Sequence, residues 1–296
     1  MNALKLLQGR YGSGEARAIY ELIMRRRFGL SRTDILLGKD TTLSADNKAE
    51  LQKIVERVAK GEPVQYVLGS EEFCGREFLV TPDVLIPRPE TQQLVQFVRQ
   101  NVAPGSTILD IGTGSGCIAI TLALDGYKVS ALDISDAALA IARKNAKRLG
   151  AEVEFGKTDI LAPSCSPFGG VSKLQNSSLP KHSPKGGAGR GLSCIVSNPP
   201  YICEGEASAM DDNVLLHEPH LALFVPDDDP LLFYRAIADY GLQHLADGGW
   251  LFFEANRAYV RQVAALLSEK GYTEIMIQKD EYDNERFVYG SRGTAL

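Results

Sequence analysis

Residues 198–201, Asn-Pro-Pro-Tyr, are the residues best suited by type and spacing to do chemistry. They follow 194–196, a short apolar run that predicts a buried strand. The amide carbonyl of Asn198 offers one hydrogen-bond acceptor, and the backbone carbonyl of Pro199 offers a second, because the two prolines hold the turn extended. Tyr201 adds a flat face against a flat substrate. The pattern suits a grip on a planar amino group, although an isolated match is also typical of a proline-rich surface turn.

Residues 110–116, Asp-Ile-Gly-Thr-Gly-Ser-Gly, lie where a predicted strand turns into a predicted helix. Glycines there let the backbone approach a ligand, and the helix N-terminus presents free N–H groups. The spacing G-x-G-x-G after an acid differs from the G-x-G-x-x-G of dinucleotide-binding enzymes. The Asp110 carboxylate suits an ammonium group and repels a pyrophosphate. The turn therefore favours S-adenosylmethionine over NAD, although such glycines also serve close packing alone.

Two further acids follow predicted strands. Asp133 ends the second strand, where an acid can accept both ribose hydroxyls; it could equally cap the helix that begins near Asp136. Asp159 follows the third strand and could contact an adenine amino group, or be an ordinary loop acid. The carboxyl ends of parallel strands meet at one sheet edge, so these acids, the glycine turn and residues 198–201 would share one crevice.

The elements that must position these residues alternate between helix and strand from about residue 91. The alternation predicts a Rossmann-like α/β fold, with a mostly parallel seven-stranded sheet, helices on both faces and a late antiparallel pair. The predicted strands are 107–111, 128–133, 152–155, 194–197, 249–254, 273–278 and 286–289. The predicted helices are 91–101, 115–124, 136–149, 230–246 and 257–269.

The first 70 residues instead predict a small helical bundle. Its helices are expected at 13–28, after a capping box at 31–34, and from Ser44 to before Gly61. Apolar residues 78–80 and 84–86 flank Thr-Pro-Asp, which predicts a hairpin between two domains. The expected domains are a bundle at 1–72, a hairpin linker at 73–90 and a sheet domain at 91–296. Residues 162–191 are rich in Ser, Pro, Gly and Lys and predict a mobile insertion, either a surface loop or a lid.

Charge is distributed unevenly along the chain. Residues 1–60 carry a net charge of +5 and the remainder carries −10, with no long basic stripe, which disfavours stable nucleic-acid binding. Basic residues 25–27 could face an acidic partner or RNA, or form a solvated helix face. No apolar run is long enough to span a membrane, and residues 1–8 do not resemble a signal peptide. Five scattered cysteines predict reduced thiols in a cytoplasmic protein without a structural zinc site.

With these motifs together, the chain resembles the HemK/PrmC family, protein-(glutamine-N5) methyltransferases that modify class I peptide chain release factors. The resemblance covers nearly the whole length. It is carried by residues 63–69, 73–78, 85–91, 110–116, 198–201, 218–223 and 284–286. Ile-Pro-Arg-Pro-Glu-Thr at 86–91 is the most discriminating segment, because generic adenine methyltransferases lack it beside this set. The chain departs from the family at Gln92, where an acid is frequent, and in the long insertion.

The resemblance implies a monomeric, cytoplasmic enzyme that uses S-adenosylmethionine, releases S-adenosylhomocysteine, needs no metal and recognises a release factor through its N-terminal bundle. The implied catalytic residues are Asn198, Pro199 and Tyr201. The implied cofactor-binding residues are Asp110, Gly112, Thr113, Gly114, Gly116, Asp133, Asp159 and Asn198. The implied substrate-binding residues are Asn198, Pro199, Pro200, Tyr201, Arg88 and Glu90.

Three alternatives stay open at this point. Arg88 and Glu90 could shape the substrate loop or cofactor site, or form an ion pair that stabilises the hairpin. The same Asn-Pro-Pro-Tyr grip would also serve an N6-adenine-type nucleic-acid amino-methyltransferase acting on a flipped base. A non-catalytic adaptor could use the fold only to bind a partner, although the intact glycine turn and Asn-Pro-Pro-Tyr disfavour this.

Overall fold

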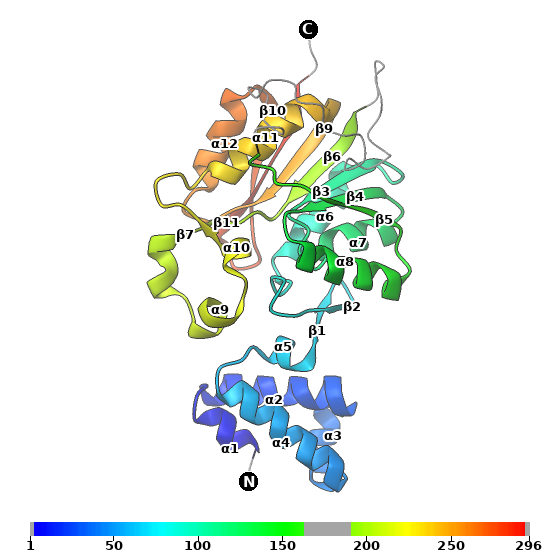
Figure 1. The fold of residues 1–296 in the computed structure, drawn as a ribbon, viewed down its shortest axis with the longest axis vertical. Helices are drawn as coiled ribbons and strands as arrows, with labels where there is room; N and C mark the ends of the chain where they lie inside the picture. The colour runs from blue at the N-terminus through cyan, green and yellow to red at the C-terminus, as the bar shows by residue number, and fades with distance from the viewer. Residues whose placement is uncertain (1–2, 163–190, 294–296) are drawn as a thin grey trace.

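The computed structural model describes residues 3–162 and 191–293 (Figure 1). The strands are β1 Ser70–Phe73, β2 Arg76–Leu79, β3 Thr107–Ile111, β4 Lys128–Asp133, β5 Val153–Lys157, β6 Leu192–Ser197, β7 Ile202–Cys203, β8 Phe224–Val225, β9 Leu245–Glu254, β10 Tyr272–Lys279 and β11 Glu285–Arg292. The α-helices are α1 Ala3–Gln8, α2 Ser13–Phe28, α3 Arg32–Leu36, α4 Ala45–Ala59, α5 Val64–Leu68, α6 Thr91–Asn101, α7 Cys117–Leu124, α8 Asp136–Leu149, α9 Asp212–His217, α10 His220–Leu223, α11 Leu232–His244 and α12 Val260–Glu269. Two 3₁₀ helices are η1 Lys39–Thr42 and η2 Glu204–Ala209.

The larger lobe is built on a seven-stranded sheet with the order β10-β11-β9-β6-β3-β4-β5. Strand β11 is antiparallel to both of its neighbours, and the other pairs are parallel. The predicted α/β fold class, with its late antiparallel pair, is confirmed. The predicted insertion at 162–191 lies outside the described residues, apart from its two ends.

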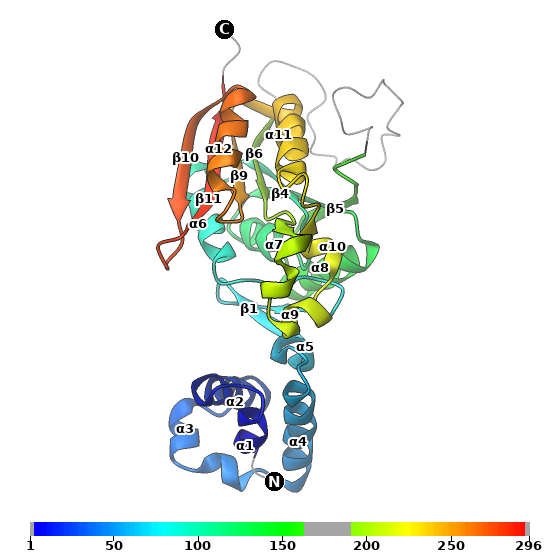
Figure 2. The ribbon, with the colours of Figure 1, turned by 90° about the vertical axis from the view of Figure 1, so that its left-hand side faces the viewer.

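Helices cover both faces of this sheet (Figures 1 and 2). Phe252 packs in a core with α6 and α7, whereas Phe253 packs in a second core with α11 and α12. Successive side chains of a strand point to opposite faces, so adjacent phenylalanines of β9 serve the two cores. Each phenyl group is fully buried, and such burial stabilises the fold by about 2–3 kcal/mol.

The smaller lobe is the helical bundle of α1 to α5 (Figure 2). Its core joins α2 to α4 through buried Ile23, Met24 and Val55. The predicted capping box is confirmed: Ser31 Oγ accepts from the Asp34 N–H at 3.2 Å, and the Asp34 carboxylate accepts from the Ser31 N–H at 3.0 Å.

The hairpin between the lobes does not lie where the sequence predicted it. Strand β1 pairs with β2 around Cys74 and Gly75, whose φ angles of 49° and 71° make a tight turn. The predicted pairing of 78–80 with 84–86 is wrong. Residues 84–86 instead contact a distant part of the chain: the Ile86 N–H donates to Glu218 Oε2 at 3.2 Å.

Hydrogen bonds and an ion pair tie the bundle to the hairpin and to α9. Arg26 of α2 reaches β1, where Nη2 lies 2.7 Å from Glu71 Oε1 and both side chains are largely buried. Arg10 Nη2 donates to Asn213 Oδ1 of α9 at 3.0 Å. The bundle is thus tied to the hairpin and to the segment that follows residues 198–201.

Candidate active site

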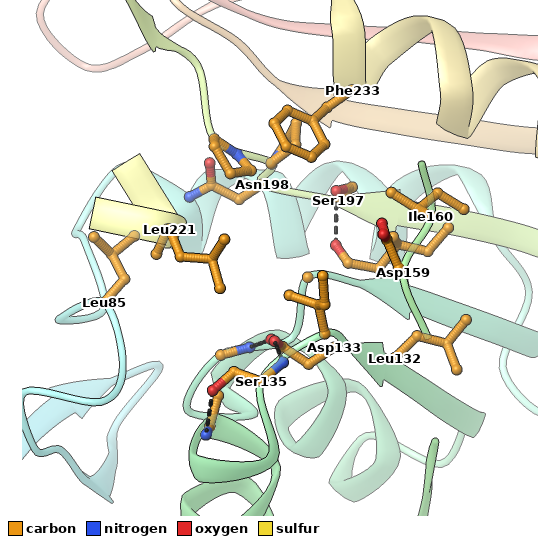
Figure 3. Close-up of a pocket in the computed structure, with 18 of the residues that line it drawn as sticks. Leu85, Leu132, Asp133, Ser135, Asp159, Ile160, Ser197, Asn198, Leu221 and Phe233 are labelled. Atoms are coloured by element: carbon orange, nitrogen blue, oxygen red, sulfur yellow. Dashed lines mark hydrogen bonds between the residues drawn. The ribbon is translucent and has the colours of Figure 1, made fainter. Parts of the chain in front are cut away.

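A cavity of about 230 Å³ opens at the carboxyl edge of the parallel strands (Figure 3). Its lining includes Gly112 and Gly114 after β3, Asp133 at the end of β4, Asp159 after β5 and Asn198 after β6. Figure 3 shows Asn198 and Asp133 on opposite sides of this space. Five residues that the sequence singled out therefore share one cavity, as the meeting of strand ends predicts.

The glycine turn divides into a cavity-facing part and a core-facing part. Gly112 and Gly114 have φ angles of 76° and 54°, and a Cβ built on either would meet no atom within 4 Å. Gly116, with φ 83°, caps α7 and faces inward, because a Cβ there would lie 2.8 Å from Ile120 Cδ1. The first two glycines leave room for a ligand, and the third permits helix packing.

Asp110 and Thr113 lie behind the turn and do not line the cavity. Asp110 is 0% exposed, and its Oδ2 accepts from the Thr113 hydroxyl at 2.7 Å. Burial raises the pKa of Asp110 to about 7, and the Thr113 hydrogen bond opposes that rise. Its Oδ1 has no hydrogen-bond partner among the described residues. Asp110 thus shapes the turn, and a direct contact with a ligand ammonium group stays a prediction.

Asp133 ties the end of β4 to the glycine turn. Its Oδ2 accepts from the Gly114 N–H at 2.8 Å, and its Oδ1 accepts from the Ser135 N–H at 2.9 Å. Burial raises the pKa of Asp133, against those backbone hydrogen bonds. The cap of α8 is Ser135, whose Oγ accepts from the Ala138 N–H, so Asp133 is not the helix cap. A carboxylate has further lone pairs, which leaves Asp133 able to accept from ligand hydroxyls.

The cavity rim combines Asp159 with apolar side chains. Asp159 is exposed, and its Oδ1 accepts from the Leu161 N–H at 2.9 Å. Ile134, Leu161 and Leu221 are large exposed apolar residues that line the same cavity. Exposed apolar side chains around a concave site are typical of ligand binding.

Asn198 stands at the boundary between this cavity and a second one. Its Nδ2 donates to Thr91 Oγ1 at 3.2 Å, and no group among the described residues donates a hydrogen bond to its Oδ1. The second cavity, about 70 Å³, shares Asn198 with the first and adds Tyr201 and Arg88. Pro199 and Pro200 line the larger cavity. Two adjoining cavities that meet at a free carbonyl acceptor could hold two reactants against each other.

Arg88 pairs with a residue far along the chain. Its Nη2 lies 2.6 Å from Glu218 Oε1, and Glu218 is only 4% exposed. The alternative of an Arg88–Glu90 ion pair is therefore wrong. Glu90 lies close enough to Glu254 for its charge to raise the pKa of that buried carboxyl, although burial is the larger cause.

Sequence reasoning missed Glu218 and Glu254 as site residues. Glu254 accepts from Thr91 Oγ1 at 2.7 Å and from the Tyr201 hydroxyl at 3.3 Å. The available signal was position: Glu254 ends β9, whose carboxyl end lies at the same sheet edge as Asn198. Glu218 lies in a segment without strand or helix signals strong enough to place it.

Comparison with known proteins finds similar sequences over nearly the whole chain. The family description "PrmC N-terminal domain" matches residues 2–69, and "Methyltransferase domain" matches 108–170. A Bacteroides thetaiotaomicron protein named release factor glutamine methyltransferase is 43% identical over 97% of this chain and 96% of its own length. A Flavobacterium psychrophilum protein of the same name is 36% identical over 93% and 91%.

The chain belongs to the release factor glutamine methyltransferase family. The family predicted from the motifs is thereby confirmed. A methyltransferase structure from Pyrococcus furiosus aligns with 85% of this chain and all of its own, with a TM-score of 0.52 and 15% identity. That likeness supports the methyltransferase fold.

Within 3–162 and 191–293, no group of three or more His, Cys, Asp and Glu side chains is arranged to hold a metal ion. No helix in the same ranges is long and apolar enough to cross a membrane.

Proposed function

We propose that this chain transfers a methyl group from S-adenosylmethionine to the side-chain amide nitrogen of the glutamine in the Gly-Gly-Gln motif of class I peptide chain release factors. The observation that carries the proposal is Asn198, whose amide nitrogen is held by Thr91 while its carbonyl is left free between two adjoining cavities. The family to which the chain belongs supports the same substrate.

The larger cavity fits the methyl donor. The open space in front of Gly112 and Gly114 would take the methionine end, and Asp133 would accept from the ribose hydroxyls. Asp159 would accept from the adenine amino group, with Ile134 and Leu161 against the flat faces of the base. When bound, S-adenosylmethionine supplies an electrophilic methyl group on a sulfonium centre.

The acceptor amide needs to be held because it is a weak nucleophile, with its lone pair delocalised into the carbonyl. The Oδ1 of Asn198 and the carbonyl of Pro199 would accept its two hydrogens. These contacts fix the nitrogen for in-line attack and become stronger as positive charge develops on it. Tyr201 would pack against the amide plane.

The chain needs no dedicated general base in this scheme. The methylated amide nitrogen is strongly acidic until it loses a proton, so the proton can pass to water after transfer. The proposed transfer also uses no metal ion. Residues 198–201 therefore act by positioning and by charge stabilisation.

The helical bundle is the proposed recognition domain for the release factor. We assign it to residues 1–72, the hairpin linker to 73–90 and the methyltransferase domain to 91–296. Its excess of positive charge and its bonds to β1 and α9 support a role in docking a protein beside the active site. The proposal further holds that the enzyme works as a cytoplasmic monomer, without stable nucleic-acid binding.

The decisive assay incubates the protein with labelled S-adenosylmethionine and, in parallel, with a class I release factor, RNA or duplex DNA. The proposed function predicts label in the release factor alone. Label in nucleic acid but not in the release factor would contradict it and would favour the amino-methyltransferase alternative, whose grip on a flipped base uses the same motif.

A further inference from the structure

A buried carboxylate lies directly behind the acceptor site. Glu254 is 1% exposed, and both of its oxygens face hydroxyl groups: Thr91 Oγ1 at 2.7 Å and the Tyr201 hydroxyl at 3.3 Å. Thr91 is itself 2% exposed and sits at the start of α6. Burying a carboxylate costs free energy unless the carboxylate is hydrogen-bonded. Loss of either contact would therefore be unfavourable, and the two contacts hold Glu254 in one geometry.

The chemistry of these groups fixes the direction of each hydrogen bond. An ionised carboxylate can only accept, so the single hydroxyl proton of Thr91 is donated to Glu254. The Thr91 oxygen is then left to accept, and the group 3.2 Å away is the amide of Asn198. Only the NH₂ end of that amide can donate to it. The chain Glu254–Thr91–Asn198 therefore dictates which end of the Asn198 amide remains for a substrate.

The opposite orientation would defeat the proposed reaction. A flipped Asn198 would present its own NH₂ to the acceptor NH₂, and two donors facing each other cannot hydrogen-bond. Side-chain amides have nearly the same shape in both orientations, so packing alone discriminates poorly between them. A directional hydrogen-bond chain supplies the discrimination that shape does not.

A second arm of the network reaches Tyr201. The hydroxyl of Tyr201 donates to Glu254, and the Asn256 amide donates to the Tyr201 carbonyl at 3.1 Å. Ring and backbone are thus both anchored. Glu254 consequently holds both residues that are proposed to contact the acceptor amide: Asn198, by way of Thr91, and Tyr201 directly.

The positive charge near Glu254 is that of Arg286. This residue belongs to segment 284–286, which contributes to the family resemblance but has no role assigned from the sequence. Burial raises the pKa of Glu254, and the nearby charge of Arg286, like the hydrogen bond from Thr91, opposes that rise and favours the ionised carboxylate. Arg286 Nε is held by Asp280 Oδ2 at 2.9 Å, and Asp280 also accepts from the Asn284 N–H at 2.9 Å. These contacts keep a cation beside the buried carboxylate.

We propose that Glu254 and Thr91 are positioning residues, which hold the carbonyl of Asn198 toward the acceptor amide through a one-way chain of hydrogen bonds. The inference rests on the proposed function for its acceptor. It adds a mechanism that residues 198–201 do not contain, since the direction of the Asn198 amide is set by groups from α6 and β9.

The test compares Thr91→Val with Thr91→Ser in steady-state methylation of a release factor. Valine keeps the shape but removes the hydroxyl, so kcat should fall about 10- to 100-fold while the affinity for S-adenosylhomocysteine stays unchanged. Serine restores the hydroxyl and should recover most of the activity. Thr121→Val is the matched control. Thr121 is fully buried in α7, its hydroxyl has no hydrogen-bond partner within residues 3–162 and 191–293, and it does not line the cavity. This variant should leave kcat unchanged.

Glu254→Leu provides a second variant if Thr91→Val fails to fold. Leucine offers no acceptor, so the Thr91 proton is no longer committed to residue 254 and the Tyr201 hydroxyl loses its acceptor; kcat should again fall without loss of cofactor affinity. Wild-type kcat in either folded variant, or a loss in Thr91→Ser equal to that in Thr91→Val, would overturn the proposal.

Hydrogen exchange of the Asn198 side chain can be measured without catalysis, so it tests this inference separately from the proposed function. In protein labelled with ¹⁵N-asparagine, one side-chain proton of Asn198 should exchange slowly in the wild type and in Thr91→Ser, and rapidly in Thr91→Val. Equal exchange in all three proteins would refute the positioning chain. A wild-type enzyme that never methylates a release factor would refute the proposed function instead, and the exchange measurement would still decide on the chain.

Discussion

At the scale of single residues, the cavity separates two kinds of polar group. Asp133 is a carboxylate fixed by two backbone N–H groups, whereas Asn198 is a neutral amide with one end held by Thr91. In the proposed function the first binds the donor and the second binds the acceptor. Substitution of each should therefore affect different kinetic constants.

Asn198→Ala should abolish methyl transfer with little effect on donor binding. The variant loses an acceptor aimed at developing positive charge, and loss of one such group typically lowers kcat by about 10²–10³-fold. Calorimetric affinity for S-adenosylhomocysteine should remain within about threefold of the wild type. Substantial methylation by Asn198→Ala would show that the proposed grip is wrong.

Asp133 should make donor binding sensitive to pH. Burial raises its pKa, so the carboxylate becomes protonated at a higher pH than the ordinary value of about 3.9. Protonation removes acceptor capacity, so affinity for S-adenosylhomocysteine should fall as the pH is lowered through that raised pKa.

Asp133→Asn is the matched variant for this prediction. It should bind about 10- to 100-fold more weakly at neutral pH, because a charge-assisted pair of hydrogen bonds is lost, and it should show a flatter pH profile. Calorimetry from about pH 5 to about pH 8 tests both points. A wild-type profile in the variant would exclude Asp133 as the titrating group.

At the scale of elements, the glycine turn predicts two different outcomes from the same substitution. Gly116→Ala places a Cβ 2.8 Å from Ile120 Cδ1 and 3.2 Å from Ala142 Cβ, at a φ of 83°. Overpacking and the left-handed backbone should together lower the free energy of unfolding by about 2–4 kcal/mol. Urea denaturation measures this loss.

Gly114→Ala is the comparison, because its Cβ would meet no atom within 4 Å. It should cost about 1–2 kcal/mol for the left-handed backbone alone, while weakening donor binding because the methyl group enters the cavity. Similar unfolding energies for the two variants would contradict the division of the turn into a core-facing and a cavity-facing part.

The sheet and its helices could be predicted because their signals are local: apolar runs, glycine turns and helical spacing. The hairpin could not, because its turn uses Cys74 at positive φ, whereas Thr-Pro-Asp at 81–83 gave the stronger turn signal. Gly112, Gly114, Asp133, Asp159 and Asn198 could be placed at one edge from strand order alone. The contact between Thr91 and Glu254 joins residues 163 apart in the chain, so only the fold reveals it.

At the scale of the whole molecule, the Arg26–Glu71 pair ties α2 of the bundle to β1, the first strand of the hairpin that leads into the catalytic lobe. Arg26→Ala leaves Glu71 without its cation, which should loosen the bundle. KM for an intact release factor should rise about 3- to 10-fold, because in the proposed function the intact factor also docks on the bundle, while KM for a short Gly-Gly-Gln peptide should not change.

Arg25→Ala is the control for this prediction, since it removes the same charge from an exposed position on α2. Its effect on the intact factor should be smaller than that of Arg26→Ala. Equal increases in KM for factor and peptide in Arg26→Ala would contradict a docking role for the bundle.

The most direct test of the central claim is mass spectrometry of a class I release factor after reaction with the protein and S-adenosylmethionine. The expected result is one added methyl group on the glutamine of the Gly-Gly-Gln motif, located by fragmentation and absent when Asn198→Ala is used. A factor that remains unmodified, or that carries the methyl group on any other residue, would contradict the account.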